Sequence, residues 1–115
     1  MSDYTYDAVV RAVHDGDTLT LDVDLGFSTW IHKRVIRLFG IDAPELATPE
    51  GIVSQAFLRS LLPIGSPVVL ESIKDRADKY GGRWLGIVYL GGMSVNGLLI
   101  EKGLAKPWVG QGPKP

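Results

Sequence analysis

The stretch that decides the fold reads Thr18-Leu19-Thr20-Leu21-Asp22-Val23-Asp24-Leu25. Apolar residues recur at every second position, which is the period of a β-strand with one buried face. Gly26 ends this strand, and after a loop that carries Phe27 and Trp30 a second apolar run covers residues 31–39. Two such runs joined by a short loop predict an antiparallel hairpin.

The segments on either side of this hairpin predict a small closed barrel. The expected strands cover residues 5–14, 18–25, 31–39, 68–73 and 83–90, and the expected helices cover 49–62 and 95–102. Five strands with a helix between the third and the fourth are typical of an OB-type barrel. The sequence therefore predicts a mainly β fold with two helices on a five-stranded OB-type barrel.

Helix boundaries are marked by capping residues. Thr48 and Pro49 fit the cap and first position of the first helix, which Pro63 ends, and Ser94 and Gly103 bracket the second. The apolar face expected for the first helix consists of Val53, Ala56, Phe57 and Leu61.

Length and composition indicate one globular unit. A chain of 115 residues, 45% hydrophobic and 22% charged, has the size of a single domain, expected over residues 1–115 with a flexible tail at 105–115. The first residues are acidic where a secretory signal would be basic, so we expect an intracellular, cytoplasmic protein with no membrane partner. Because cysteine is absent, disulfides, thiolate metal sites and cysteine nucleophiles are excluded.

Charge is unevenly distributed along the chain. Residues 1–45 hold eight acidic and four basic residues, whereas residues 46–115 hold eight basic and five acidic ones, for a net charge of −1. This pattern fits either an acidic site that faces a basic wall or an ordinary solvated surface. A protein that only coats single strands needs a basic groove, so the charge count argues against that class.

Two arginines mark a candidate site. Arg37 lies in the apolar run 35–39, where a guanidinium needs a carboxylate, a phosphate or solvent as its partner. Arg83 begins the last expected strand and, if it faces the same barrel mouth, forms with Arg37 a pair of bidentate donors for phosphate oxygens. An outward-facing strand arginine and a solvated connection are the respective alternatives.

Carboxylates gather at two turns near these arginines. Asp42 and Glu45 lie three positions apart in a turn fixed by Pro44, and Asp15 and Asp17 precede the second strand. Hard divalent cations prefer carboxylate and backbone oxygens, so a metal site is one interpretation. An ordinary turn is the other, because Asp and Gly favour turns in any case.

Taken together, these segments resemble the staphylococcal (micrococcal) nuclease, or thermonuclease-like, family of phosphodiesterases. The matching segments follow the family's order and approximate spacing over residues 6 to about 106. They are Asp15-Gly16-Asp17-Thr18, Ile36-Arg37-Leu38, Ile41-Asp42-Ala43-Pro44-Glu45, Asp78-Lys79-Tyr80-Gly81 with Arg83, Val95-Asn96 and Gly103-Leu104-Ala105-Lys106.

Two departures from the family pattern accompany the match. Gly82 is an extra residue before Arg83, and the family's long C-terminal helix is absent. Apolar surface left uncovered by that helix predicts self-association, with a homodimer as one form.

The resemblance implies a role for each matching residue. The implied calcium ligands are Asp17, Asp42 and the backbone carbonyl of Ala43, with Asp15 in support. The implied catalytic residues are Arg37, Arg83 and Glu45. The arginines would hold the scissile phosphate, and Glu45 would orient or deprotonate the attacking water. The implied contacts to a substrate phosphate are Lys79 and Tyr80.

The implied activity is that of a calcium-dependent endonuclease, a hydrolase that cleaves DNA, with RNA as a wider expectation. Little sequence preference and 3′-phosphate products are further implications of the resemblance. One cation and two guanidiniums supply the electrostatic stabilisation that a phosphodiester needs. A noncatalytic nuclease-like module that binds nucleic acid or a protein partner is the alternative, and a net charge of −1 predicts a weak grip on polyanions.

The histidines and tryptophans carry less information. His14 and His32 lack the spacing of a metal pair and are expected to be ordinary strand or surface residues. Trp30 and Trp84 are expected to pack. Trp108 follows the second helix, where the family resemblance implies aromatics that contact substrate, so base stacking is one expectation for it.

Overall fold

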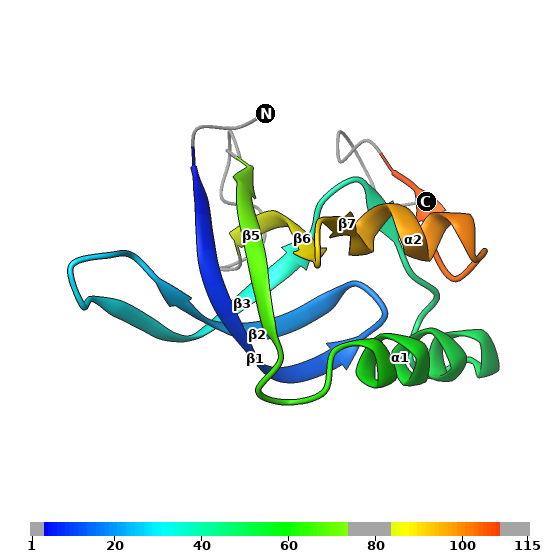
Figure 1. The fold of residues 1–115 in the computed structure, drawn as a ribbon. Coiled ribbons are helices and arrows are strands. Elements are labelled where there is room, and N and C mark those ends of the chain that lie inside the picture. The colour runs from blue at the N-terminus through cyan, green and yellow to red at the C-terminus, as the bar shows by residue number, and fades with distance from the viewer. Residues whose placement is uncertain (1–3, 74–83, 109–115) are drawn as a thin grey trace.

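The computed structural model describes residues 4–73 and 84–108 (Figure 1). In chain order its elements are β1 (Thr5–Asp15), β2 (Thr18–Asp24), β3 (Trp30–Leu38), β4 (Ile41–Asp42), α1 (Pro49–Leu61), β5 (Pro67–Ile73), β6 (Trp84–Leu90), β7 (Met93–Ser94), α2 (Val95–Glu101) and β8 (Lys106–Pro107).

Five strands form a closed barrel. Neighbours follow the order β3, β2, β1, β5, β6, each pair antiparallel, and a parallel pairing of β3 with β6 at Ile36 and Trp84 closes the ring. The short strand β7 extends from β6, and β4 pairs with β8 in a small second sheet. The predicted mainly β fold, a five-stranded OB-type barrel with two helices, is therefore confirmed.

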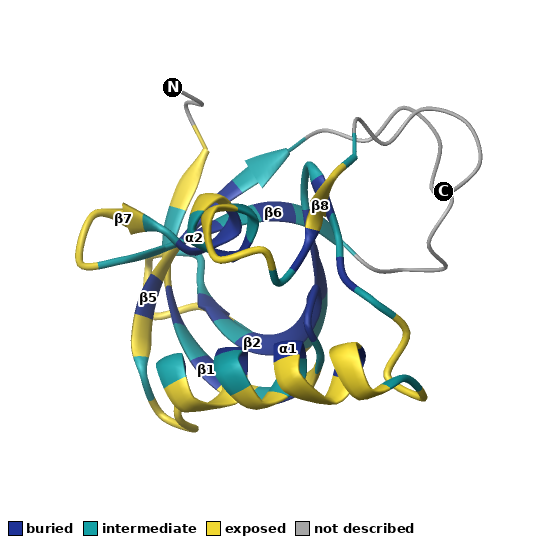
Figure 2. Ribbon diagram, turned by 90° about the vertical axis from the view of Figure 1, so that its right-hand side faces the viewer, coloured by how far each residue is buried: buried dark blue, intermediate teal, exposed yellow. Residues whose placement is uncertain are grey.

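The barrel interior holds the hydrophobic core (Figure 2). Leu19, Leu21 and Val23 of β2 are fully buried in it, as their period of two predicts. The polar positions between them are less exposed than a solvated strand face would be: Thr18 and Thr20 are also buried. The Thr18 hydroxyl donates to Asp17, and the Thr20 hydroxyl lies 2.6 Å from Nε2 of His14, so both groups are satisfied within the protein.

Helix α1 packs against β1 and begins at the predicted cap. The Thr48 hydroxyl accepts the N–H of Gly51, and Pro49 follows it as the first helical residue. The expected face is confirmed in part, because Phe57 and Leu61 pack against the core whereas Val53 is 57% exposed. The buried residues of the helix are Gly51, Ser54 and Leu58. Small residues on this face let the helix approach the barrel closely. A Cβ at Gly51 would overlap the carbonyl oxygen of Glu45.

Helix α2 is capped by Ser94 and begins at Val95, as predicted, and it ends at Glu101, one residue early. The following segment differs from the expected tail, since Ala105 is buried and residues 106–107 pair with β4 as β8. A two-residue pairing leaves no periodic pattern in a sequence, so it could not be read in advance. Residues 109–115 lie outside the described ranges. No helix within those ranges has the length and hydropathy needed to cross a membrane.

Candidate active site

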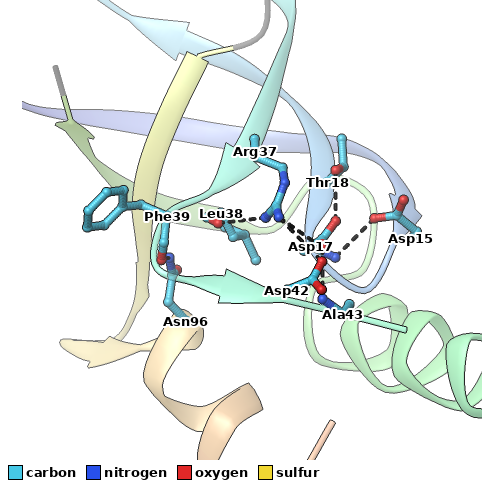
Figure 3. Close-up of polar contacts among 9 residues, drawn as sticks. All are labelled: Asp15, Asp17, Thr18, Arg37, Leu38, Phe39, Asp42, Ala43 and Asn96. Carbon is cyan, nitrogen blue, oxygen red and sulfur yellow. Dashed lines mark hydrogen bonds and ion pairs between the residues drawn. The ribbon is translucent and has the colours of Figure 1, made fainter. Parts of the chain in front are cut away.

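Three segments bring the candidate residues together at one end of the barrel (Figure 3). The β1–β2 turn supplies Asp15 and Asp17, β3 supplies Arg37, and β4 supplies Asp42. The strand register fixes their relation, because Thr18 of β2 lies opposite Arg37 of β3. The N–H of Leu38 also donates to the backbone carbonyl of Asp17 at 2.8 Å, which ties the turn to β3.

Gly16 allows the β1–β2 turn to approach its neighbours. A Cβ at this position would lie 2.7 Å from Cβ of Ser54 on α1 and 2.8 Å from Cβ of Ala43. These distances are well below the separation at which carbon atoms pack, so any side chain would push the turn outward. Because Gly16 has no side chain, the turn lies close to both α1 and the segment after β4. This close packing fixes the position of Asp17.

Arg37 is the centre of the site. Its side chain is 3% exposed, and Nη1 donates to the Leu38 carbonyl at 2.9 Å. Nη2 lies 3.5 Å from Oδ2 of Asp17 and 3.7 Å from Oδ1 of Asp42. These ion-pair distances leave Nη2 buried without a hydrogen bond in the described part of the chain. The guanidinium thus meets carboxylates, one of the partners that its apolar surroundings predicted.

Asp17 is buried, and both of its carboxylate oxygens accept a hydrogen bond. Oδ1 accepts from the Thr18 hydroxyl at 3.0 Å, and Oδ2 accepts from the N–H of Ala43 at 2.8 Å. Burial, the largest influence, and Asp15 raise the pKa of Asp17, against the opposing effects of the Ala43 N–H and the Arg37 guanidinium. Asp15 stabilises the turn, because its Oδ1 accepts the N–H of Asp17 at 3.0 Å.

Asp42 and Glu45 line one pocket of about 640 Å³ between the segment after β4, the start of α1 and the segment from Gly103 to Lys106. The exposed side chain of Glu45 extends from a backbone that is held firmly. Its carbonyl accepts both the N–H and the hydroxyl of Thr48, at 3.0 and 2.6 Å. This pocket adjoins the buried arginine through Asp42, which belongs to both.

Trp108 has a contact that the sequence did not reveal. Its ring lies beside the Arg37 guanidinium, with Cζ 5.2 Å from the ring centroid. The N–H of Trp108 donates to the Gly40 carbonyl at 2.8 Å, which continues the pairing of β8 with β4. A tryptophan after the second helix was the available signal, but only the β4–β8 pairing brings it to Arg37.

Asn96 is a second residue whose part was not recognised, although the segment Val95-Asn96 belongs to the family resemblance. Its Nδ2 donates to the carbonyls of Phe39 and Gly86, at 2.9 and 3.2 Å, and its Oδ1 accepts the N–H of Val88 at 3.1 Å. One buried side chain therefore joins α2 to β6 and to the turn that follows β3. Figure 3 shows Asn96 beside Phe39 of that turn.

A family model described as staphylococcal nuclease homologue matches residues 35–113, which is more than half of the chain. The chain belongs to this family. Membership agrees with the observed barrel and establishes a nuclease-type fold. The staphylococcal nuclease match includes Arg37, Asp42 and Glu45 and begins after Asp17, so it is the geometry that joins Asp17 to the matched residues.

Some of the residues expected from the staphylococcal nuclease resemblance are not placed. Lys79, Tyr80 and Arg83 lie in the segment 74–83, outside the described residues. Within residues 4–73 and 84–108, no three His, Cys, Asp or Glu side chains come together as a metal-binding group. Asp17 and Asp42 converge on Arg37, and neither Asp15 nor Glu45 completes a three-residue set with them.

The other aromatic and histidine residues behave largely as expected. The ring of Trp84 packs beneath the Arg34 guanidinium, with Cζ 4.3 Å from the ring centroid. His14 is bonded to Thr20, and Nδ1 of His32 lies 3.3 Å from Asp22. Trp30, expected to pack, is instead 41% exposed.

Proposed function

We propose that this chain is a nuclease that hydrolyses phosphodiester bonds of DNA with little sequence preference, with RNA as a wider expectation. The observation that carries the proposal is the environment of Arg37. Its Nη2 is buried near two carboxylates and makes no hydrogen bond within the described ranges. Leaving a buried donor unpaired is unfavourable, so such an N–H group is suited to donate a hydrogen bond to an anionic oxygen.

The reaction requires charge stabilisation more than any other contribution. Negative charge on a phosphodiester repels the attacking water, and further charge develops in the transition state. A guanidinium that is fixed in advance can stabilise that charge with two parallel hydrogen bonds. Arg37 is oriented by the Leu38 carbonyl, by two carboxylates and by Trp108, so the guanidinium itself is fixed before a phosphate binds. Arg83 is assigned as the second phosphate ligand by resemblance.

Calcium is the proposed cofactor, and the donor set suits it. Asp17, Asp42 and the Ala43 carbonyl offer only oxygen ligands, which hard cations prefer. Calcium takes roughly six to eight ligands, so water and substrate oxygens have to supply the rest. When bound, the ion would neutralise charge on the phosphate.

Glu45 is the proposed residue for orienting the attacking water and accepting its proton. Its carboxylate is exposed and lines the same pocket as Asp42, and its backbone is held by Thr48. A general base must reach the proton that it removes, and this pocket provides space for a water beside it. Lys79 and Tyr80 are retained as proposed contacts to a second phosphate.

The proposal is tested with plasmid DNA and a single-stranded oligonucleotide, each with calcium or with excess chelator. Wild type is compared with Arg37→Lys and with the control Arg59→Lys, which alters an exposed residue in the last turn of α1. Cleavage is expected with calcium only. Arg37→Lys should lower turnover by about 100-fold, because an ammonium cannot make the two-pronged contact. Arg59→Lys should behave as wild type.

Each contrary result has a distinct meaning. Oligonucleotide binding without cleavage under any condition would identify the noncatalytic module instead. Equal cleavage with chelator and with calcium would remove the metal from the mechanism. Near-normal turnover of Arg37→Lys would assign Arg37 to the structure of the barrel and would overturn the proposed site.

A further inference from the structure

The loop between β2 and β3 carries exposed aromatic rings away from the candidate active site. This hairpin extends beyond the body of the barrel (Figure 1). Phe27 is fully exposed, Trp30 is 41% exposed, and the side chain of His32 is 67% exposed. We call residues 26–33 the hairpin tip. Exposed aromatic rings clustered on one projection are typical of a binding surface.

The backbone of the hairpin tip holds Phe27 in solvent. Gly26, Phe27 and Ser28 have φ values of 83, 54 and 59°, three consecutive residues in the left-handed region. Glycine adopts this conformation readily, whereas phenylalanine and serine do so rarely. The turn is closed by hydrogen bonds of Leu25 N–H to the Thr29 carbonyl and of Thr29 N–H to the Gly26 carbonyl, at 2.8 and 2.9 Å. An unfavourable conformation that presents an apolar ring to water indicates a function for the ring.

A bulge in β3 orients two further rings of the hairpin tip, those of Trp30 and His32. The β2–β3 register shifts between Leu21 and Val23, and Lys33 has a φ of 56°. Asp22 stabilises the bulge, because it accepts the N–H of Lys33 at 2.8 Å and lies 3.3 Å from Nδ1 of His32. The rings of Trp30 and His32 are consequently parallel within 6°, with centroids 6.3 Å apart.

The charges on the hairpin tip favour an anionic partner. Residues 26–33 contain the exposed Lys33 and no acidic residue. The nearest carboxylates on β2 are already engaged: Asp22 pairs with His32 and Arg11, and Asp24 accepts the N–H of Gly26. Flat aromatic faces beside a cation match the stacked bases and the phosphate of a nucleic-acid strand.

We propose that the hairpin tip is an accessory site for single-stranded nucleic acid, at which Phe27 and Trp30 stack on bases while Lys33 contacts the backbone. The substrate class rests on the proposed nuclease function, but the binding event does not require cleavage. A strand held at Arg37 reaches the tip by running along β3.

The separation of the two sites gives this proposal a length dependence. Trp30 and Arg37 are seven positions apart on β3, or roughly 23 Å at the usual rise of a strand. If the strand keeps the stacked spacing of one duplex strand, about 3.4 Å per nucleotide, this distance corresponds to roughly seven nucleotides. A stacked strand of four nucleotides bound at Arg37 is then too short to contact the tip, whereas one of fifteen can contact both places.

The test compares the double variant Phe27→Ala/Trp30→Ala with wild type and with Ile64→Ala. Ile64 is a matched control, because it is 75% exposed and lies between α1 and β5, outside the hairpin. Dissociation constants are measured by fluorescence anisotropy with chelator present, for labelled single strands of 4 and 15 nucleotides. The double variant should bind the 15-mer about tenfold more weakly and the 4-mer as wild type does. The control should match wild type on both.

The remaining outcomes decide against the hairpin tip without deciding the nuclease function. An equal loss on both lengths would mean that the variant disturbs the candidate active site. Unchanged binding of the 15-mer would remove the tip as a nucleic-acid site. If sedimentation then showed that wild type is a dimer and the double variant a monomer, the tip would be assigned to protein contact. Cleavage with calcium is assayed separately, so an inactive protein that binds the 15-mer through the tip would overturn the nuclease proposal and leave this one standing.

Discussion

Arg37 and Asp17 are both buried charges, and their neighbours determine how much that burial costs. Arg37 retains a carbonyl, two carboxylates and the ring of Trp108 as compensating contacts. Asp17 retains two hydrogen-bond donors and the guanidinium, yet burial and Asp15 still raise its pKa. The ionised carboxylate therefore opposes folding, as charged groups retained for function commonly do.

The raised pKa of Asp17 predicts the stability of an isosteric variant. Between the unfolded pKa, about 3.9, and the raised folded pKa, the folded state binds more protons, so the free energy of unfolding falls as pH rises. Asp17→Asn cannot ionise and should be more stable than wild type at pH 7 by on the order of 1 kcal/mol. Denaturant unfolding between pH 4 and pH 8, without metal, should show this difference shrinking toward low pH.

Asp7→Asn is the matched control, since Asp7 is exposed on β1. Its stability should follow wild type across the same pH range. A less stable Asp17→Asn at pH 7 would mean that pairing with Arg37 outweighs the cost of burying the carboxylate.

Trp108 provides a second prediction for a single residue. Removing its ring with Trp108→Ala frees one face of the Arg37 guanidinium and loses a contact of about 1 kcal/mol that helps to fix this proposed phosphate ligand. Turnover on a 4-nucleotide substrate should fall by about fivefold to tenfold, with a smaller change in KM, and Trp108→Phe should recover much of the loss. A large rise in KM with normal kcat would instead assign Trp108 to base stacking.

At the scale of elements, prediction succeeded where a pattern repeats over several residues. The period of two in β2 identified its buried face, and the cap at Thr48 located the start of α1. The buried face of α1 was assigned correctly only at Phe57 and Leu61, because close packing there also requires Gly51 and Ser54, and small residues carry no apolar signal. The pairing of β4 with β8 depends on two residues from each segment, so no period could indicate it.

Asn96 joins elements that are distant in sequence, and this predicts a large effect of its removal. Asn96→Ala leaves the carbonyls of Phe39 and Gly86 and the N–H of Val88 without this partner. Unpaired buried polar groups are costly, so the free energy of unfolding should fall by about 3 kcal/mol in chemical denaturation. Asn96→Asp keeps the acceptor for Val88 but loses both donors, and it should recover little. A loss below about 1 kcal/mol would show that water or a rearrangement replaces these bonds.

For the molecule as a whole, the sequence brought out candidate site residues but not the contacts between them, and the roles of these residues stay predictions. Asp17 and Asp42 lie beside Arg37, which belongs to the same acidic part of the chain, so a basic wall that faces the acidic site stays a prediction. The third and fourth carboxylates expected around a cation do not join them in the described residues. Distances between turns depend on strand register and on the close approach at Gly16, which a linear pattern does not encode. Self-association stays a prediction, and exposed Ile52 and Val53 of α1 are apolar surface that it would use.

Calcium binding should be visible in the stability of the whole molecule, because a ligand that binds only the folded state stabilises it by RT ln(1 + [L]/Kd). At 100 times Kd this amounts to about 2.7 kcal/mol, which raises the Tm of a domain of this size by roughly 10 °C. Asp42→Asn removes a proposed ligand and should lose most of the increase. The control is Glu50→Gln. Glu50 is an exposed residue in the first turn of α1 that lines the same pocket, and this variant should keep the increase in Tm.

The response of the variants distinguishes a calcium site at the two carboxylates near Arg37 from a nonspecific ion effect. Calcium screening a surface would raise the Tm of all three proteins alike, and magnesium at equal ionic strength would do the same. A site built on Asp17 and Asp42 predicts that only wild type and Glu50→Gln respond, and that calcium exceeds magnesium, which demands a stricter octahedral shell. Equal increases in Asp42→Asn and wild type would show that the ion does not bind between these carboxylates. The buried guanidinium would then be the only fixed phosphate-binding charge among the described residues of the proposed site.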